Sequence, residues 1–162
     1  MMAVRPEAHA DRPALALNLE LSHGRPGASA RVELHDRAAA APAPMGGGSR
    51  VARVALRGCI DAVAAGRLAR ALDDLALYHV DLVRVDCAEL RHIDFRELPG
   101  LVGALGRFEA RASGVVLCGL SRYLCDLFRL AGCESRLRSW SSTDDLLETG
   151  VSAPEPGREC AS

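Results

Sequence analysis

Residues 51–75 read VARVALRGCIDAVAAGRLARALDDL, and the spacing of the apolar residues changes once within this stretch. Up to Gly58 the apolar side chains are typical of a β-strand. From Asp61 onward the leucines recur at helical spacing and share one face of a predicted helix. These leucines are Leu68, Leu72 and Leu75. A strand that leads through a short joint into an amphipathic helix is the repeating unit of an α/β domain.

The same alternation continues after this stretch. The next predicted elements are a strand over 82–85, a helix over 98–108, a strand over 115–120, a helix capped by Ser121 and ended by Gly132, a short strand ending at Trp140, and a last helical turn from Thr143. Strands that alternate with helices through short joints predict a largely parallel sheet. The fold class is therefore α/β, with helices alternating along the chain with the strands.

The flanks of this region have a different composition. Residues 37–50 form a linker rich in Pro, Ala and Gly. Before the linker, apolar residues alternate around a turn at 23–27, which leaves three alternatives for the first 36 residues: a hairpin, one added strand or a mostly disordered leader. We predict a flexible N-terminal extension over 1–50, one domain over 51–150 and a disordered tail over 151–162.

Charge and hydropathy exclude several classes of function. The chain has 20 basic and 21 acidic residues, and its formal net charge of −1 argues against a nucleic-acid-binding protein. The longest hydrophobic stretch without charges, residues 112–121, is about half as long as the roughly 20 residues of a membrane helix. Charges among the first 12 residues also argue against a signal peptide. We expect a cytoplasmic protein without direct membrane insertion.

No motif of catalysis or metal binding is found. None of the six cysteines forms a C-x-x-C pair, which argues against a metal site. The glycines at 46–48 belong to the linker rather than to a phosphate-binding loop. The acidic pairs Asp73-Asp74 and Asp144-Asp145 are predicted on solvated helix surfaces. We therefore expect a protein that is not an enzyme and that has no cofactor.

Four short segments, at the joints between the predicted elements, resemble one known family. They are GCID at 58–61, VRVDCAELRHID at 83–94, GVVLCGLS at 114–121 and LAG at 130–132. Their order and spacing resemble the STAS domain, the fold of bacterial anti-sigma-factor antagonists and of sulfate-transporter tails, over residues 51–147. The resemblance implies a mixed, mostly parallel sheet with alternating helices.

The chain departs from the family pattern at one position. After the Ile-Asp of this motif, antagonists typically carry Ser-Ser-Gly or Ser-Thr-Gly, and a partner kinase phosphorylates the second hydroxyl residue. Here Ile93-Asp94 is followed by Phe95-Arg96-Glu97, so Arg96 occupies the phospho-acceptor position and cannot be phosphorylated there. Either Asp94 caps the following helix with Glu97 as its capping partner, or the helix begins near Pro99.

The resemblance implies a protein-binding module that regulates transcription by partner switching. Its expected partner is a kinase-type anti-sigma factor. The expected contact residues are Asp61, Asp94, Phe95, Arg96 and Glu97. Helix capping is the alternative role for the two aspartates, and core packing is the alternative for the phenylalanine. A second reading is an accessory or scaffold subunit of a transporter or signalling assembly, with transporter subunits as partners.

Overall fold

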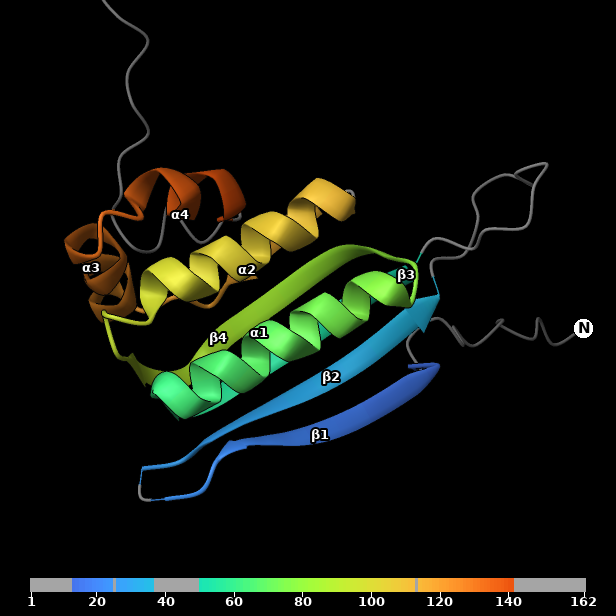
Figure 1. The fold of residues 1–162 in the computed structure, drawn as a ribbon, viewed down its shortest axis with the longest axis horizontal. Coiled ribbons are helices and arrows are strands. Elements are labelled where there is room, and N and C mark those ends of the chain that lie inside the picture. The colour runs from blue at the N-terminus through green and yellow to red at the C-terminus, as the bar shows by residue number, and fades with distance from the viewer. Residues whose placement is uncertain (1–12, 25, 37–49, 113, 142–162) are drawn as a thin grey trace, which may run out of the picture.

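The computed structural model describes residues 13–24, 26–36, 50–112 and 114–141, which form one sheet and four helices. Figure 1 shows the arrangement. In chain order the elements are β1 Leu15–Ser22, β2 Ala28–Asp36, β3 Arg50–Ile60, α1 Ala62–Leu77, β4 Val80–Ile93, α2 Leu98–Arg111, β5 Gly114–Cys118, α3 Arg122–Leu130 and α4 Glu134–Trp140.

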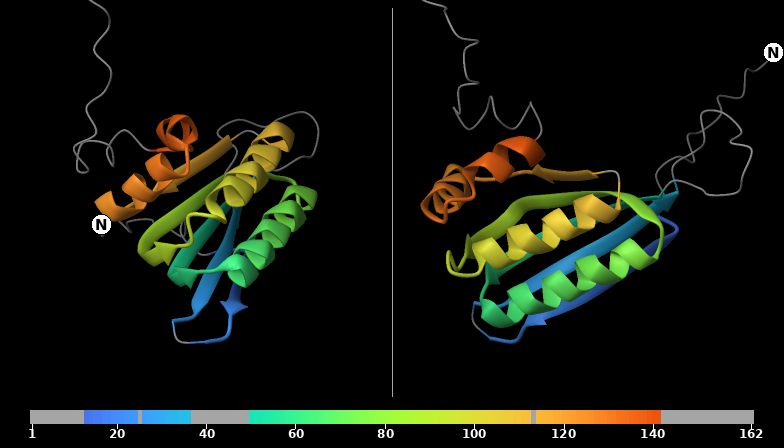
Figure 2. Two further views of the ribbon diagram at one scale, coloured as in Figure 1. Left: turned by 60° about the vertical axis from the view of Figure 1, so that its left-hand side comes forward. Right: turned by 45° about the horizontal axis from the view of Figure 1, so that its top comes forward.

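The sheet is mixed, and its strands lie in sequence order from β1 to β5. Strands β3, β4 and β5 pair in parallel, whereas β1 with β2 and β2 with β3 pair antiparallel. Helices α1 and α2 provide the crossovers between the parallel strands and lie on the same face of the sheet (Figures 1 and 2). The α/β class and the alternation of helices with strands are confirmed, with the parallel pairing confined to β3–β5.

The described part of the N-terminal region is a docked hairpin, which is the first of the three alternatives. Strand β2 pairs with β3 in unbroken register from Ala28↔Gly58 to Asp36↔Arg50. A two-stranded hairpin is marginal alone in water, and this one is stabilised because it extends a larger sheet. Strands β1 and β2 therefore belong to the same sheet as β3, while residues 37–49 of the linker and the predicted tail at 151–162 lie outside the described residues.

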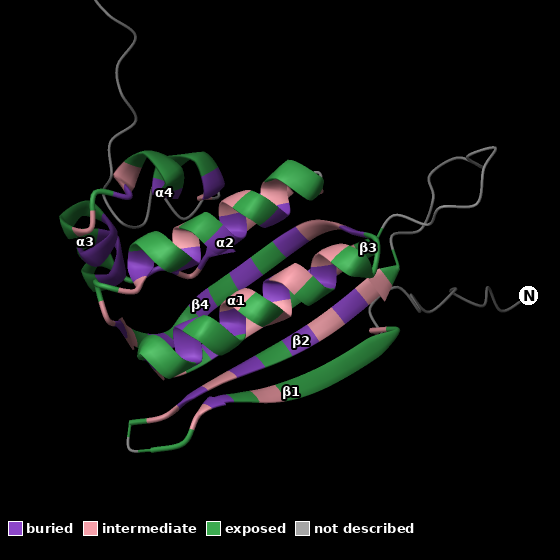
Figure 3. Cartoon of the chain, viewed as in Figure 1, coloured by how far each residue is buried: buried purple, intermediate pink, exposed green. Residues whose placement is uncertain are grey.

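The core is aliphatic and lies between the sheet and the helices. Every second residue of β3 is buried (Ala52, Val54 and Leu56), as expected for a strand with one covered face. Figure 3 shows the same alternation of buried and exposed residues along β4, and it shows the buried stripes of α1 and α2. Ser121 caps α3 through its side chain, as predicted, and Asp61 caps α1, which is the alternative role given for this aspartate.

Two predicted elements differ from the structure. The second strand of the alternating region is longer than 82–85, because Cys87, Leu90 and Ile93 continue to bury side chains across register shifts. The predicted strand ending at Trp140 is wrong. These residues form α4, whose buried Leu137 and Trp140 are three apart and share a helical face. The helical turn predicted from Thr143 lies outside the described residues.

An ion pair on α4 gives a pH-dependent prediction. The Arg138 guanidinium donates to Glu134 Oε1 over 2.8 Å and, with Arg129 of α3, lowers the pKa of the Glu134 carboxyl below its ordinary value of 4.5. A carboxyl whose pKa is lower in the folded state stabilises the fold above its unfolded-state pKa, and this contribution is lost as the pH falls through the folded-state pKa. Urea unfolding of wild type and Glu134→Gln should therefore differ at neutral pH and converge below about pH 4.5.

The matched control for this prediction is Arg138→Met. It removes the main cause of the lowered pKa while keeping the carboxyl, so the pH dependence assigned to Glu134 should shrink without changing sign. A stability difference between wild type and Glu134→Gln that stays constant across the acidic range would contradict the assignment.

Candidate functional site

Three strand-to-helix joints lie at one end of the molecule. Because β3, β4 and β5 are parallel, their carboxyl ends meet at the same edge, and α1, α2 and α3 begin there (Figure 1, left). This edge is where α/β proteins commonly place their binding residues, since helix N-termini expose free N–H groups. The predicted contact residues all come from the first two of these joints.

Asp61 is the joint between β3 and α1. It is exposed, and its Oδ1 accepts a hydrogen bond of 2.8 Å from the Ala64 backbone N–H. The capping role weighed for this aspartate is therefore present in the structure. Capping occupies one carboxylate oxygen, so the exposed carboxylate keeps acceptor capacity toward solvent.

Asp94 ends β4 and organises the turn that follows. Its backbone N–H donates to the Ile60 carbonyl over 2.9 Å, which holds the two aspartate joints side by side. Its Oδ1 accepts from the Arg96 N–H at 3.0 Å, and its carbonyl accepts from the Glu97 N–H at 2.9 Å. Residues 94–97 thus form a turn closed by both the side chain and the backbone of Asp94.

Helix α2 begins after this turn, at Leu98. Glu97 is its N-cap residue but makes no side-chain capping bond, so the predicted capping pair of Asp94 with Glu97 is wrong. The alternative start near Pro99 is confirmed. Proline is tolerated in the first turn because N–H groups there have no intrahelical partner, whereas a helix starting at Phe95 would lose a bond at Pro99.

Phe95 and Arg96 project from the turn. Phe95 is 52% exposed, which excludes the core-packing alternative. The Arg96 Cζ atom lies 5.9 Å from the centroid of the Phe95 ring, within the range of a cation–π contact. Within the ranges that the structure describes, Arg96 has no ion-pair partner. The pair presents an aromatic face and a fixed positive charge to solvent.

A second aromatic pair lies at the same edge. His92 Nδ1 and Tyr123 Oη are 2.7 Å apart, and the two rings stack with centroids 5.9 Å apart and an interplanar angle of 25°. His92 is on β4 and Tyr123 is in the first turn of α3, after its Ser121 cap. We did not predict Tyr123 as a site residue. The signal was available, since the third parallel strand has to end beside the other two.

The described part of the chain contains no group of three His, Cys, Asp or Glu side chains that are placed to hold a metal ion. None of the helices seen in this part is long and apolar enough to cross a membrane. The edge presents acidic, aromatic and basic side chains to solvent, among them Asp61, Phe95 and Arg96.

Comparison with known proteins adds a family match. The family model described as "Mlab, STAS domain" matches residues 46–139, which span β3 to all but the last residue of α4 and leave the β1–β2 hairpin outside. No curated protein matches the sequence.

Two solved structures are similar to the chain. One is the anti-sigma factor antagonist SpoIIAA in its unphosphorylated form, at 18% identity over 64% of this chain and 91% of that chain, with a TM-score of 0.47. The other is an anti-sigma factor antagonist from Mycobacterium paratuberculosis, at 16% identity over 74% of this chain and 92% of that chain, with a TM-score of 0.48.

Proposed function

Because the chain belongs to the STAS domain family, we propose that it is a non-enzymatic module that binds a protein partner and acts in the cytoplasm of a bacterium to regulate transcription. The proposed docking surface consists of Asp61, Asp94, Phe95, Arg96 and Glu97. The observation that carries this proposal is the exposure of Phe95 and Arg96 on a turn that Asp94 closes. We propose a kinase-type anti-sigma factor as the partner.

The hydrogen bonds of the turn at residues 94–97 hold the backbone of the proposed docking surface in a fixed conformation. The Asp94 side chain and backbone fix the N–H groups of Arg96 and Glu97, and the Asp94 N–H is itself bonded to Ile60 at the end of β3. A surface whose backbone is already ordered loses little conformational entropy on binding. Phenylalanine and arginine are both enriched in protein–protein interfaces relative to the rest of the surface.

Arg96 gives the proposed surface a charge that does not switch. A phosphorylatable hydroxyl residue at this position would be neutral when unmodified and about −2 when phosphorylated at neutral pH, and the helix N-terminus would favour the anionic state. Arginine stays cationic and carries no hydroxyl group. In antagonists of this family the unphosphorylated form binds the anti-sigma factor, so we propose that this chain is constitutively competent for binding and selects a partner with an acidic contact surface.

Charge reversal at Arg96 tests the proposal. Affinity capture from cytoplasm and solubilised membranes, read out by mass spectrometry, should recover a kinase-type anti-sigma factor with wild type and lose it with Arg96→Glu. For the purified pair, we expect affinity to fall at least about tenfold, because the substitution places like charges against each other.

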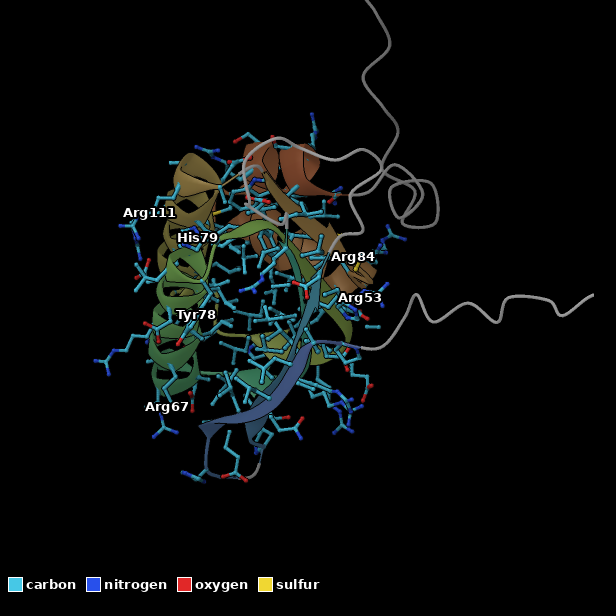
Figure 4. All side chains as sticks on the ribbon, turned by 90° about the vertical axis from the view of Figure 1, so that its right-hand side faces the viewer. Arg53, Arg67, Tyr78, His79, Arg84 and Arg111 are labelled. Carbon is cyan, nitrogen blue, oxygen red and sulfur yellow. The ribbon has the colours of Figure 1, made fainter. Side chains whose placement is uncertain are left out.

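The matched control is Arg53→Glu. Arg53 is exposed on β3, and Figure 4 shows it on the opposite side of the sheet from α1. This variant should retain the partner. Equal recovery with Arg96→Glu and wild type would contradict the docking surface, whereas recovery of transporter subunits by wild type would favour the alternative of an accessory subunit.

A further inference from the structure

Strand β1 is an exposed edge strand with an apolar face. Its sequence LALNLELS places the leucines at every second position, on the face that α1 covers only in part. Leu15 and Leu17 are 46% and 48% exposed, whereas Leu21 is fully buried. Edge strands usually carry lysine, proline or inward-pointing charges that prevent pairing with another chain, and β1 has none of these on its leucine face.

A groove of about 400 Å³ runs between β1 and α1. Leu17, Leu19 and Leu21 line its strand side. Its helix side includes Arg67, Arg70 and Asp74 of α1 and Tyr78, which directly follows the helix; Figure 4 labels Arg67 and Tyr78. Arg67 Nη1 donates to the Glu20 carbonyl over 3.3 Å, which fixes the basic end of the helix beside the C-terminal end of β1. The groove is therefore apolar along the strand and charged along the helix.

We propose that β1 pairs with β1 of a second copy of this chain, antiparallel about a two-fold axis through Asn18. The two five-stranded sheets would form one continuous sheet. The leucines of both β1 strands would pack side by side on the same face of that sheet. The proposal goes beyond the docking surface described above, because β1 lies at the sheet edge opposite β5 and contributes none of its residues.

The leucine spacing selects the register of this pairing. In an antiparallel pair, directly opposed residues point to the same face, so leucine must oppose leucine if both apolar faces are to lie together. A two-fold axis through Asn18 opposes Leu17 with Leu19 and Leu15 with Leu21 of the second copy. It also opposes Glu20 with Ala16, so no like charges face each other. A shift by one residue would place the two leucine sets on opposite faces of the sheet.

The same two-fold axis would bring charged residues of opposite sign from the two α1 helices to the same level. From Leu15 to Glu20 the strand rises about 17 Å, and from Arg67 to Leu77, the last residue of α1, the helix rises about 15 Å. The helix segment and the strand segment are therefore similar in length. Because the axis reverses their direction, the Asp74 end of one helix lies level with the Arg67 end of the other. Arg70 and Asp74 have no ion-pair partner among the residues that the structure describes.

Sedimentation equilibrium of the full chain tests the proposal. Wild type should show a reversible monomer–dimer equilibrium, and Leu17→Asp should raise the dissociation constant at least about 100-fold, since it buries like charges beside the axis. Leu130→Asp is the matched control, because Leu130 is exposed on α3, which follows β5, the edge strand opposite β1. Far-UV circular dichroism should show that both variants fold.

A cross-link tests the register independently of Leu17. Asn18→Cys places two thiols opposite each other at the axis, where opposed Cβ atoms lie about 5 Å apart, so mild oxidation should give a disulfide-linked dimer. Asn18→Ser should not cross-link, and adding Leu17→Asp to Asn18→Cys should abolish the product. A wild-type chain that stays monomeric overturns the proposal, whatever else covers β1. It is also overturned if Leu17→Asp leaves the equilibrium unchanged, if Leu130→Asp weakens it equally, or if Asn18→Cys gives no linked dimer.

Discussion

Gly58→Ala is expected to destabilise the fold by about 3–5 kcal/mol, the sum of a strained backbone and an overpacked contact. Gly58 has φ of +85°, and a Cβ atom there would lie 2.0 Å from the Gly27 carbonyl oxygen. That oxygen accepts the Cys59 N–H over 3.1 Å, so it cannot move away without losing a bond. The side chain would therefore separate the β1–β2 turn from the end of β3. Urea unfolding followed by the fluorescence of Trp140 measures the effect.

The control Gly132→Ala separates the effect of backbone strain from the effect of the overpacked contact. Gly132 also has positive φ, at +72°, but no atom would lie within 4 Å of a Cβ atom there. It follows α3 as the residue that ends the helix, and its substitution should cost only about 1 kcal/mol. Equal losses at Gly58 and Gly132 would show that backbone conformation accounts for both, and that the close approach of the hairpin contributes nothing.

Leu98→Ala is the second large effect, with an expected loss of about 3–4 kcal/mol from lost burial and a residual cavity. Leu98 is 1% exposed and is the first residue of α2, directly after the turn that carries Phe95 and Arg96. Its side chain anchors the start of the helix in the core. The truncation should therefore also weaken partner binding, because it loosens the residue that fixes the C-terminal end of the turn.

The control for this prediction is Leu130→Ala. It removes the same atoms from a side chain that is 78% exposed, so its effect on the free energy of unfolding should stay below about 0.5 kcal/mol. Calorimetry of both variants, combined with partner titrations at a temperature where both are folded, separates stability from binding. A loss below 1 kcal/mol at Leu98 would mean that this end of the core collapses around the smaller side chain.

The elements that the sequence predicts well combine a periodic apolar face with a local cap. Helix α1 has both, with leucines at helical spacing and Asp61 before them, and α3 has the Ser121 cap. The strand prediction at Trp140 was wrong because the segment is short, and its two buried side chains, three residues apart, fit no strand alternation. Short segments take their structure from tertiary contacts, and Trp140 is fully buried in the core.

At the candidate site, the sequence predicts which residues lie at the joints but not how they contact one another. The family resemblance placed Asp94 and Arg96 at the joint before the second helix of the alternating region, and in the structure they lie in the turn that precedes α2. The bond from the Asp94 N–H to Ile60 and the pairing of His92 with Tyr123 join residues far apart in the chain. Such contacts follow from the parallel order of β3, β4 and β5, which local spacing does not specify.

The contact between Gly27 and Gly58 shows that the folding unit begins earlier in the chain than the family match does. The match begins at residue 46, but β3 is paired from Arg50 to Gly58 with β2, which lies before it. A fragment from residue 46 onward, or a translation product initiated at Met45, would expose β3 as an unprotected edge of eleven residues. The β1–β2 hairpin therefore covers the edge of β3, and we expect a proteolytic cut that releases it to promote aggregation through that strand.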